Sequence, residues 1–79
     1  MAEAYGLNEA FTAVSIDTTD DELVIRLVDR EVRVPWHRCS AVLAAATAED
    51  RRWAELSPGG YGIHWPTLDE DLSIGGLVG

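Results

Sequence analysis

Hydrophobic and polar residues alternate in three stretches near the start of the chain. The stretches are FTAVSID at positions 11–17, ELVIRLV at 22–28 and EVRVP at 31–35, and the acidic run between the first two favours a turn. A period of two residues is typical of a strand with one buried face. We therefore predict three strands in succession, with Pro35 ending the third because proline cannot donate a ladder hydrogen bond.

The second and third predicted strands are separated only by residues 29–30. A loop of those two residues pairs Ile25 with Val34 and leaves Arg26 and Arg33 together on the opposite face. A shift of one residue would send one strand's apolar side chains to the wrong side of the sheet. The pattern therefore predicts a tight hairpin with this register.

Helix-forming residues follow from 37 to 46, with a narrow apolar stripe at helical spacing. Thr47 followed by Asp50 resembles a capping box, so we expect a second short helix to begin at Ala48. The SPGG sequence at 57–60 ends that helix. Two short helices are thus predicted between the third strand and the end of the chain.

The closing segment, GYGIHWPTLDEDLSIGGLVG, begins with a predicted fourth strand at 61–65 that ends at Pro66. One face of this strand carries the apolar residues Tyr61, Ile63 and Trp65. Ser73 is suited to cap a final helical turn, and the acids before it interact well with helix amides. The order β-β-β-α-α-β plus a short C-terminal helical turn predicts one α+β domain over 1–79, a small antiparallel sheet with helices packed on one face.

The charge balance restricts the partners that this domain can bind directly. Among 79 residues there are 14 acids and 6 arginines, with no lysine, so the net charge is −8. Such a charge repels phosphate backbones and anionic membranes, so we expect no direct binding to nucleic acid or membrane. It suits a basic protein partner, although acids also serve simply to keep small proteins in solution.

The single cysteine and the hydropathy profile bear on location. Cys39 alone cannot form an internal disulfide or a cysteine-based zinc cluster, and a small buried thiol is the expected role. Residues 1–6 carry no basic or apolar segment of signal-peptide type, and no apolar run reaches the ~20 residues of a membrane span. We expect a cytoplasmic protein.

His64 and the acids Asp69, Glu70 and Asp71 raise the question of a reactive site. Histidine and carboxylates do serve as acid–base groups and metal ligands. One histidine beside one acidic run is unspecific, however, and an EF-hand reading fails because Ile74 stands where that loop needs glycine. We expect a structural role or a partner contact, and assign no catalytic residue, no cofactor and no metal.

The tryptophans and the sheet face carrying arginines provide further candidate contacts. Trp65 is expected in the core, and Trp53 is expected to face the core together with Leu56 from the second helix. Trp36, at a strand end, is the tryptophan expected nearest the surface. The outer sheet face has no cover in this chain and would suit a partner or a homodimer, as would a free strand edge. We expect this face to carry Val24, Arg26, Val28, Arg33 and His64. The candidate partner-binding residues are therefore Trp36, His64, Asp69, Glu70, Asp71, Arg26 and Arg33.

The closing segment also resembles a known family. Its spaced residues G-I-H-W-P-x-L-D-E-D-L-S-I-x-G-L-x-G at 62–79, with Leu43, Ala46 and Arg51 upstream, are similar to the small prokaryotic family called domain of unknown function 2442. The chain lacks the glycine this family commonly has in its hairpin turn. The resemblance implies no catalytic residues. It implies short prokaryotic proteins, some fused to a helix-turn-helix domain and some encoded beside a small protein as its expected antitoxin.

These observations lead to a ranked set of hypotheses. The first is a non-enzymatic protein-interaction module, the antitoxin-like or regulatory partner in a prokaryotic two-protein system, binding a small basic protein encoded nearby. The alternative is an accessory domain that acts near DNA through a partner. The least favoured is a small hydrolase or metal-dependent enzyme using His64.

Overall fold

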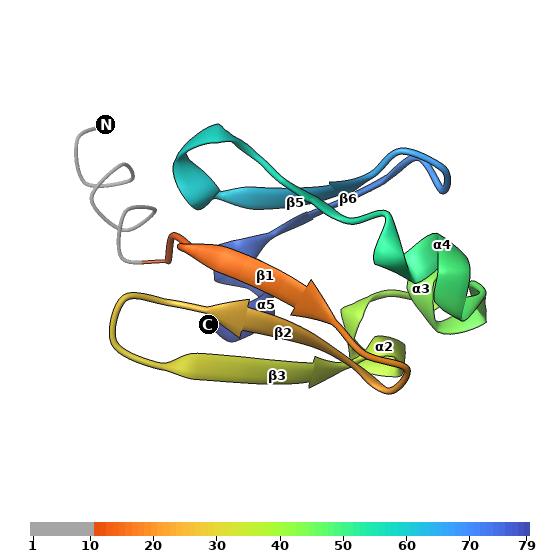
Figure 1. Cartoon of the computed structure of the whole chain (residues 1–79), viewed down its shortest axis with the longest axis horizontal. Coiled ribbons are helices and arrows are strands. Elements are labelled where there is room, and N and C mark those ends of the chain that lie inside the picture. Colours follow the sequence, from red (N-terminus) through yellow and green to blue (C-terminus); the bar gives the residue numbers. More distant parts are fainter. Residues whose placement is uncertain (1–10) are drawn as a thin grey trace.

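The computed structural model describes residues 11–79, so the expectation about a signal peptide at 1–6 lies outside it. The described chain folds into two three-stranded antiparallel sheets with short helical segments, which confirms the α+β class. In Figure 1 the strands β5 and β6 lie above β1, β2 and β3, and α2, α3 and α4 gather at one end. The elements are β1 Ser15–Thr18, β2 Glu22–Arg26, β3 Glu31–Pro35, α2 Trp36–Cys39, α3 Ala41–Ala45, α4 Ala48–Arg52, β4 Glu55–Leu56, η1 Pro58–Gly60, β5 Gly62–Trp65, β6 Glu70–Ser73 and α5 Ile74–Val78.

The first sheet has the order β1-β2-β3, as the alternating pattern predicts. Its hairpin register differs from the predicted one, because Ile25 pairs with Val32 and Leu23 with Val34. The turn therefore spans residues 27–30 and is closed by the Leu27 amide, which donates to the Arg30 carbonyl at 2.7 Å. A shift of two residues keeps every side chain on its predicted face, so hydrophobic patterning could not distinguish the two registers.

The second sheet, β4-β5-β6, contains two strands that the sequence did not reveal. Of its three strands only β5 was predicted. β4 is 2 residues long, which is too short to show an alternating pattern. β6 was interpreted as an acidic lead into a helical turn, whereas Leu72 pairs with Ile63 and Asp71 with His64. Charged residues are poor strand formers, and this strand forms because the turn after Pro66 folds it back onto β5. Ser73 does cap α5, accepting a hydrogen bond from the Gly76 amide as predicted.

The two sheets share one hydrophobic core, which also receives side chains from α2, α3 and α5. At its centre the rings of Trp36 and Trp65 meet edge to face, with centroids 6.4 Å apart. Each indole N–H has a partner, since Trp36 donates to the Thr19 carbonyl and Trp65 to the Arg51 carbonyl, both at 3.0 Å. The buried cluster comprises Ala13, Leu23, Ile25, Leu27, Val34, Trp36, Leu43, Ile63, Trp65 and Ile74.

The predicted helix at 37–46 is two short helices, because Ser40 is extended (φ −170°, ψ 162°) and caps the second one. Its hydroxyl accepts a hydrogen bond from the Leu43 amide. The capping of α4 is as predicted, with the Thr47 hydroxyl accepting from the Asp50 amide. Serine favours helix N-termini over helix interiors, so the break at Ser40 had a signal that the run of alanines obscured.

Arg51 connects these helices to the rest of the fold. Its guanidinium donates to the carbonyls of Leu43 at 2.9 Å and Ala44 at 3.0 Å, and reaches the Asp20 carbonyl at 3.4 Å. It also lies 5.3 Å from the centroid of the Trp36 ring. One planar side chain thus satisfies carbonyls at the end of α3 and covers an aromatic face.

Candidate functional site

The outer face of the sheet β4-β5-β6 carries a row of polar residues. Glu55 lies opposite His64, and His64 lies opposite Asp71, so the three side chains cross the sheet side by side. The next row on the same face contains Ser57, Gly62 and Ser73. Strand alternation sends the row between them, including Ile63 and Leu72, into the core. This sheet therefore presents a polar face that contains two acids and no arginine.

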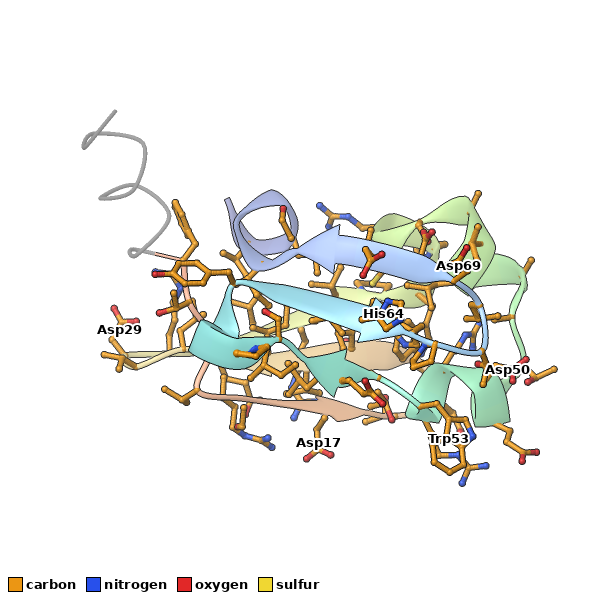
Figure 2. The ribbon with its side chains drawn as sticks, turned by 90° about the horizontal axis from the view of Figure 1, so that it is seen from above. Asp17, Asp29, Asp50, Trp53, His64 and Asp69 are labelled. Carbon is orange, nitrogen blue, oxygen red and sulfur yellow. The ribbon has the colours of Figure 1, made fainter. Side chains whose placement is uncertain are left out.

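His64 and Asp71 are in direct contact. The Nδ1 atom of His64 lies 2.7 Å from an Asp71 carboxylate oxygen, and the aspartate side chain is 75% exposed. Beside this pair the face is hollowed over about 390 Å³, with Ser57, Tyr61, Gly62 and Ser73 completing the lining. Figure 2 shows His64 in the middle of this face. The geometry gives an oriented imidazole at the rim of a shallow depression.

The two neighbouring acids occupy different positions from Asp71. Asp69 is exposed in the turn that joins β5 to β6, where it has a left-handed backbone with φ 51°. Glu70 lies opposite Trp65 at the turn end of β6 and is half-buried. Figure 2 shows Asp69 at the turn, some way along the sheet from His64. Of the predicted acidic run, only Asp71 is brought to His64.

Arg26 and Arg33 lie on the outer face of the other sheet, with acids as partners. Arg26 contacts Asp17 at 3.3 Å and Glu31 at 3.5 Å, while Arg33 contacts Glu22 at 3.2 Å and Glu31 at 2.9 Å. Hydrogen bonding to Glu22 and Glu31 raises the pKa of Arg33. His64 does not share this face, contrary to the prediction of one sheet.

The apolar part of that outer face is also smaller than predicted. Val24, expected to be open to a partner, is only 2% exposed and lies between Asp17 and Arg33 in the register. Val28 is at the tip of the hairpin turn, away from the strands. The described residues therefore form a charged and internally paired surface on this sheet rather than an exposed apolar one.

The tryptophan predictions are reversed at two positions. Trp36, proposed as a surface contact, is 3% exposed because it starts α2 and turns into the core. Trp53, predicted to be in the core with Leu56, is 59% exposed because α4 ends before it and Leu56 lies in β4 instead. Trp53 lines a small surface hollow with Glu49 and Arg52. The early end of a helix of only 5 residues was the feature that the spacing could not reveal.

Cys39 is half-buried, close to its predicted environment, and its thiol donates to the Val34 carbonyl at 3.8 Å. Burial raises the pKa of this thiol from 9.0 to about 11. It is therefore protonated at neutral pH, whereas a reactive cysteine has a thiolate stabilised by its surroundings.

Residues 11–79 contain neither a metal-binding cluster nor a membrane-spanning helix. In that part of the chain no group of three or more histidine, cysteine, aspartate or glutamate side chains is placed to hold a metal ion. None of the helices there is long and apolar enough to cross a membrane.

The fold and the face together define a small α+β domain with one core between two antiparallel sheets and a polar, hollowed outer surface on the second sheet. A family model described as Protein of unknown function (DUF2442) matches residues 13–79, and the chain belongs to this family. No curated protein and no solved structure matches the chain. The sequence-based resemblance is thus confirmed, and the closing motif that carried it is the β5–β6 hairpin followed by α5.

Proposed function

We propose that this domain is a non-enzymatic interaction module that binds a small basic protein, as the antitoxin-like partner in a prokaryotic two-protein system of the cytoplasm. The observation that carries the proposal is the outer face of the β4-β5-β6 sheet. Glu55 and Asp71 are exposed there with no arginine in their row. Exposed acids on a sheet face that carries no arginine are suited to steering and binding a basic surface.

The contrast between the two sheets supports the choice of this face. On the first sheet the outer arginines are in contact with Asp17, Glu22 and Glu31, so that surface is nearly self-neutralised. The net charge of −8 is therefore concentrated elsewhere, including on the second sheet and its turn. A basic partner gains more from acids that have no arginine beside them than from acids that already hold arginines.

The hydroxyl groups beside His64 also support a binding role over an enzymatic one. A hydrolase reading would need a nucleophile activated by His64, and Ser57 and Ser73 line the same hollow. Both hydroxyl oxygens accept backbone hydrogen bonds, from the amides of Gly62 at 2.9 Å and Gly76 at 3.0 Å. The two serines therefore stabilise the N-terminal ends of β5 and α5. His64 contacts Asp71 and neither serine.

The test is co-expression of the tagged domain with the small basic protein encoded beside it. We expect the pair to co-purify at low ionic strength and to separate as salt is raised, because exposed charges are screened. If the partner inhibits growth, the domain should restore it. Failure to form a complex, together with failure to restore growth, would overturn the proposal.

A regulatory role near DNA is separated from this one by a gel-shift assay with and without the partner. The domain alone is expected not to shift DNA at any salt concentration, because 14 acids face 6 arginines. A shift that appears only with the complex would add DNA regulation to the interaction role. A DNA shift by the free domain would contradict the expectation that the acidic domain does not bind DNA directly.

A further inference from the structure

We propose that the hollow on the outer face of β4-β5-β6 binds one arginine side chain of the partner protein. This inference rests on the proposed function, since it names the group that the acidic face recognises. The hollow is lined by Ser57, Tyr61, Gly62, Ile63, His64, Asp71, Leu72 and Ser73. No arginine is among them.

The floor of the hollow exists because Gly62 has no side chain. Gly62 is the central member of its row, with Ser57 on one neighbouring strand and Ser73 on the other. A Cβ atom there would stand 3.3 Å from the Leu72 carbonyl oxygen and 3.8 Å from the Ser57 hydroxyl, so an added methyl group would occupy the floor in contact with both. The backbone and the small side chains leave a shallow trough between Tyr61 and the His64–Asp71 pair.

The rim of the hollow supplies a negative charge with a fixed orientation. One Asp71 oxygen is 2.7 Å from His64 Nδ1, which holds the carboxylate in place and leaves its second oxygen available. Glu55 lies on the far side of His64 in the same row. At the other end lies Tyr61, an aromatic residue that is 44% exposed. A carboxylate and an aromatic ring thus lie on either side of the hollow, whose floor consists mainly of backbone atoms.

These surroundings match an arginine side chain better than other groups. A guanidinium has only donors, and the groups facing it include a carboxylate and two serine hydroxyl oxygens that can accept. Its planar shape allows stacking on the Tyr61 ring while two N–H groups point to one side, which an ammonium group cannot do. The methylene stem fits over Gly62, and an anionic group would be repelled by Asp71 and Glu55. A shallow, open hollow suits one side chain rather than a buried small molecule.

The inference can be tested with a minimal probe by NMR. N-acetyl-arginine methylamide is titrated into the isotope-labelled domain, and N-acetyl-citrulline methylamide, which has nearly the same shape without the charge, serves as the comparison. We expect saturable shifts of the Gly62, His64 and Asp71 amides, with a dissociation constant on the order of millimolar for so small a ligand. The citrulline probe should bind at least about tenfold more weakly.

Two variants and a matched control locate the site. Asp71→Asn removes the rim charge and should weaken arginine binding about five- to tenfold, the range of one net hydrogen bond. Gly62→Ala adds a methyl group to the floor and should also weaken arginine binding. Asp29→Asn removes the same charge in the β2–β3 turn of the other sheet, and Figure 2 shows Asp29 well apart from His64. That control should bind as the parent does. If Gly62→Ala does not fold, Asp71→Asn still decides the result.

The inference is overturned if the shifts at Asp29 and Asp50 equal those at the hollow, which would show diffuse attraction, or if Asp71→Asn binds unchanged. Its failure is distinct from failure of the proposed function. A stable complex with the basic protein that tolerates Asp71→Asn would place the partner on another surface. Arginine binding at the hollow without any protein complex would leave the site standing and remove the two-protein role.

Discussion

Gly60 has a backbone conformation and a close contact that only glycine can accommodate. It has φ 77°, and its carbonyl accepts a hydrogen bond from the Ala13 amide at 2.8 Å. A Cβ atom built at Gly60 would collide with the Ala13 carbonyl oxygen, which is a backbone atom and cannot move aside. The SPGG sequence is therefore a site of close approach between two segments as well as a helix stop.

Replacing this glycine tests that statement directly. Gly60→Ala should lower the free energy of unfolding by about 3 kcal/mol or more, since the left-handed penalty of ~1–2 kcal/mol is added to the backbone collision. Gly59→Ala is the matched control, because Gly59 also has a positive φ of 84° but faces only the movable Tyr61 ring at 2.9 Å. It should cost about 1–2 kcal/mol, the left-handed penalty alone. Urea unfolding measures both, and equal losses would contradict the argument.

At the scale of elements, the sequence predicted those that have a strong internal pattern. The first three strands, β5, α4 and the Ser73 cap all come from alternation or capping residues and are confirmed. β4 and β6 were missed because the first is too short for any period and the second has Leu72 as its only apolar residue. Both strands are defined by pairing with β5, which is a tertiary effect rather than a local one.

The candidate site was predictable only in part for the same reason. His64 and Asp71 were both named, but their contact depends on β6 pairing with β5 in the observed register. Gly62 carried no chemical signal, although its place between Ser57 and Ser73 creates the hollow. Trp36 and Trp53 exchanged roles because the chain turns sharply at Pro35 and again after Arg52, and a residue spacing cannot report such turns.

The contacts of Arg51 with the end of α3 should contribute to the stability of the helical region. Arg51→Lys should destabilise the domain by about 2 kcal/mol, because an ammonium group cannot reach both the Leu43 and Ala44 carbonyls while stacking on Trp36. Arg52→Lys is the matched control, since Arg52 is exposed, and it should change stability by less than about 0.5 kcal/mol. Thermal unfolding compares the two, and equal effects would show that Arg51 acts only as a surface charge.

The whole molecule has its two sheets differentiated by charge. The first sheet carries every strand arginine and matches each with nearby acids, so its outer face adds little to the net charge. The second sheet has none, and its row from Glu55 to Asp71 contains two carboxylates and no arginine. Exposed pairs of the first kind contribute at most about 1 kcal/mol each to stability, so their main effect is on which face attracts a basic partner.

Because the two sheets share one hydrophobic core, we expect them to unfold together. Ile63 comes from the second sheet and is 1% exposed in the same cluster as Leu23 and Ile25 of the first. Ile63→Val should therefore cost about 1 kcal/mol, and the loss should appear equally in tryptophan fluorescence, in far-UV circular dichroism and in hydrogen exchange of the β2 amides. Val28→Ala, at a turn residue that is 89% exposed, should leave all three unchanged within about 0.5 kcal/mol. A loss confined to β5 and β6 would mean that the second sheet opens on its own, and the hollow would then be a locally unstable surface rather than a preformed one.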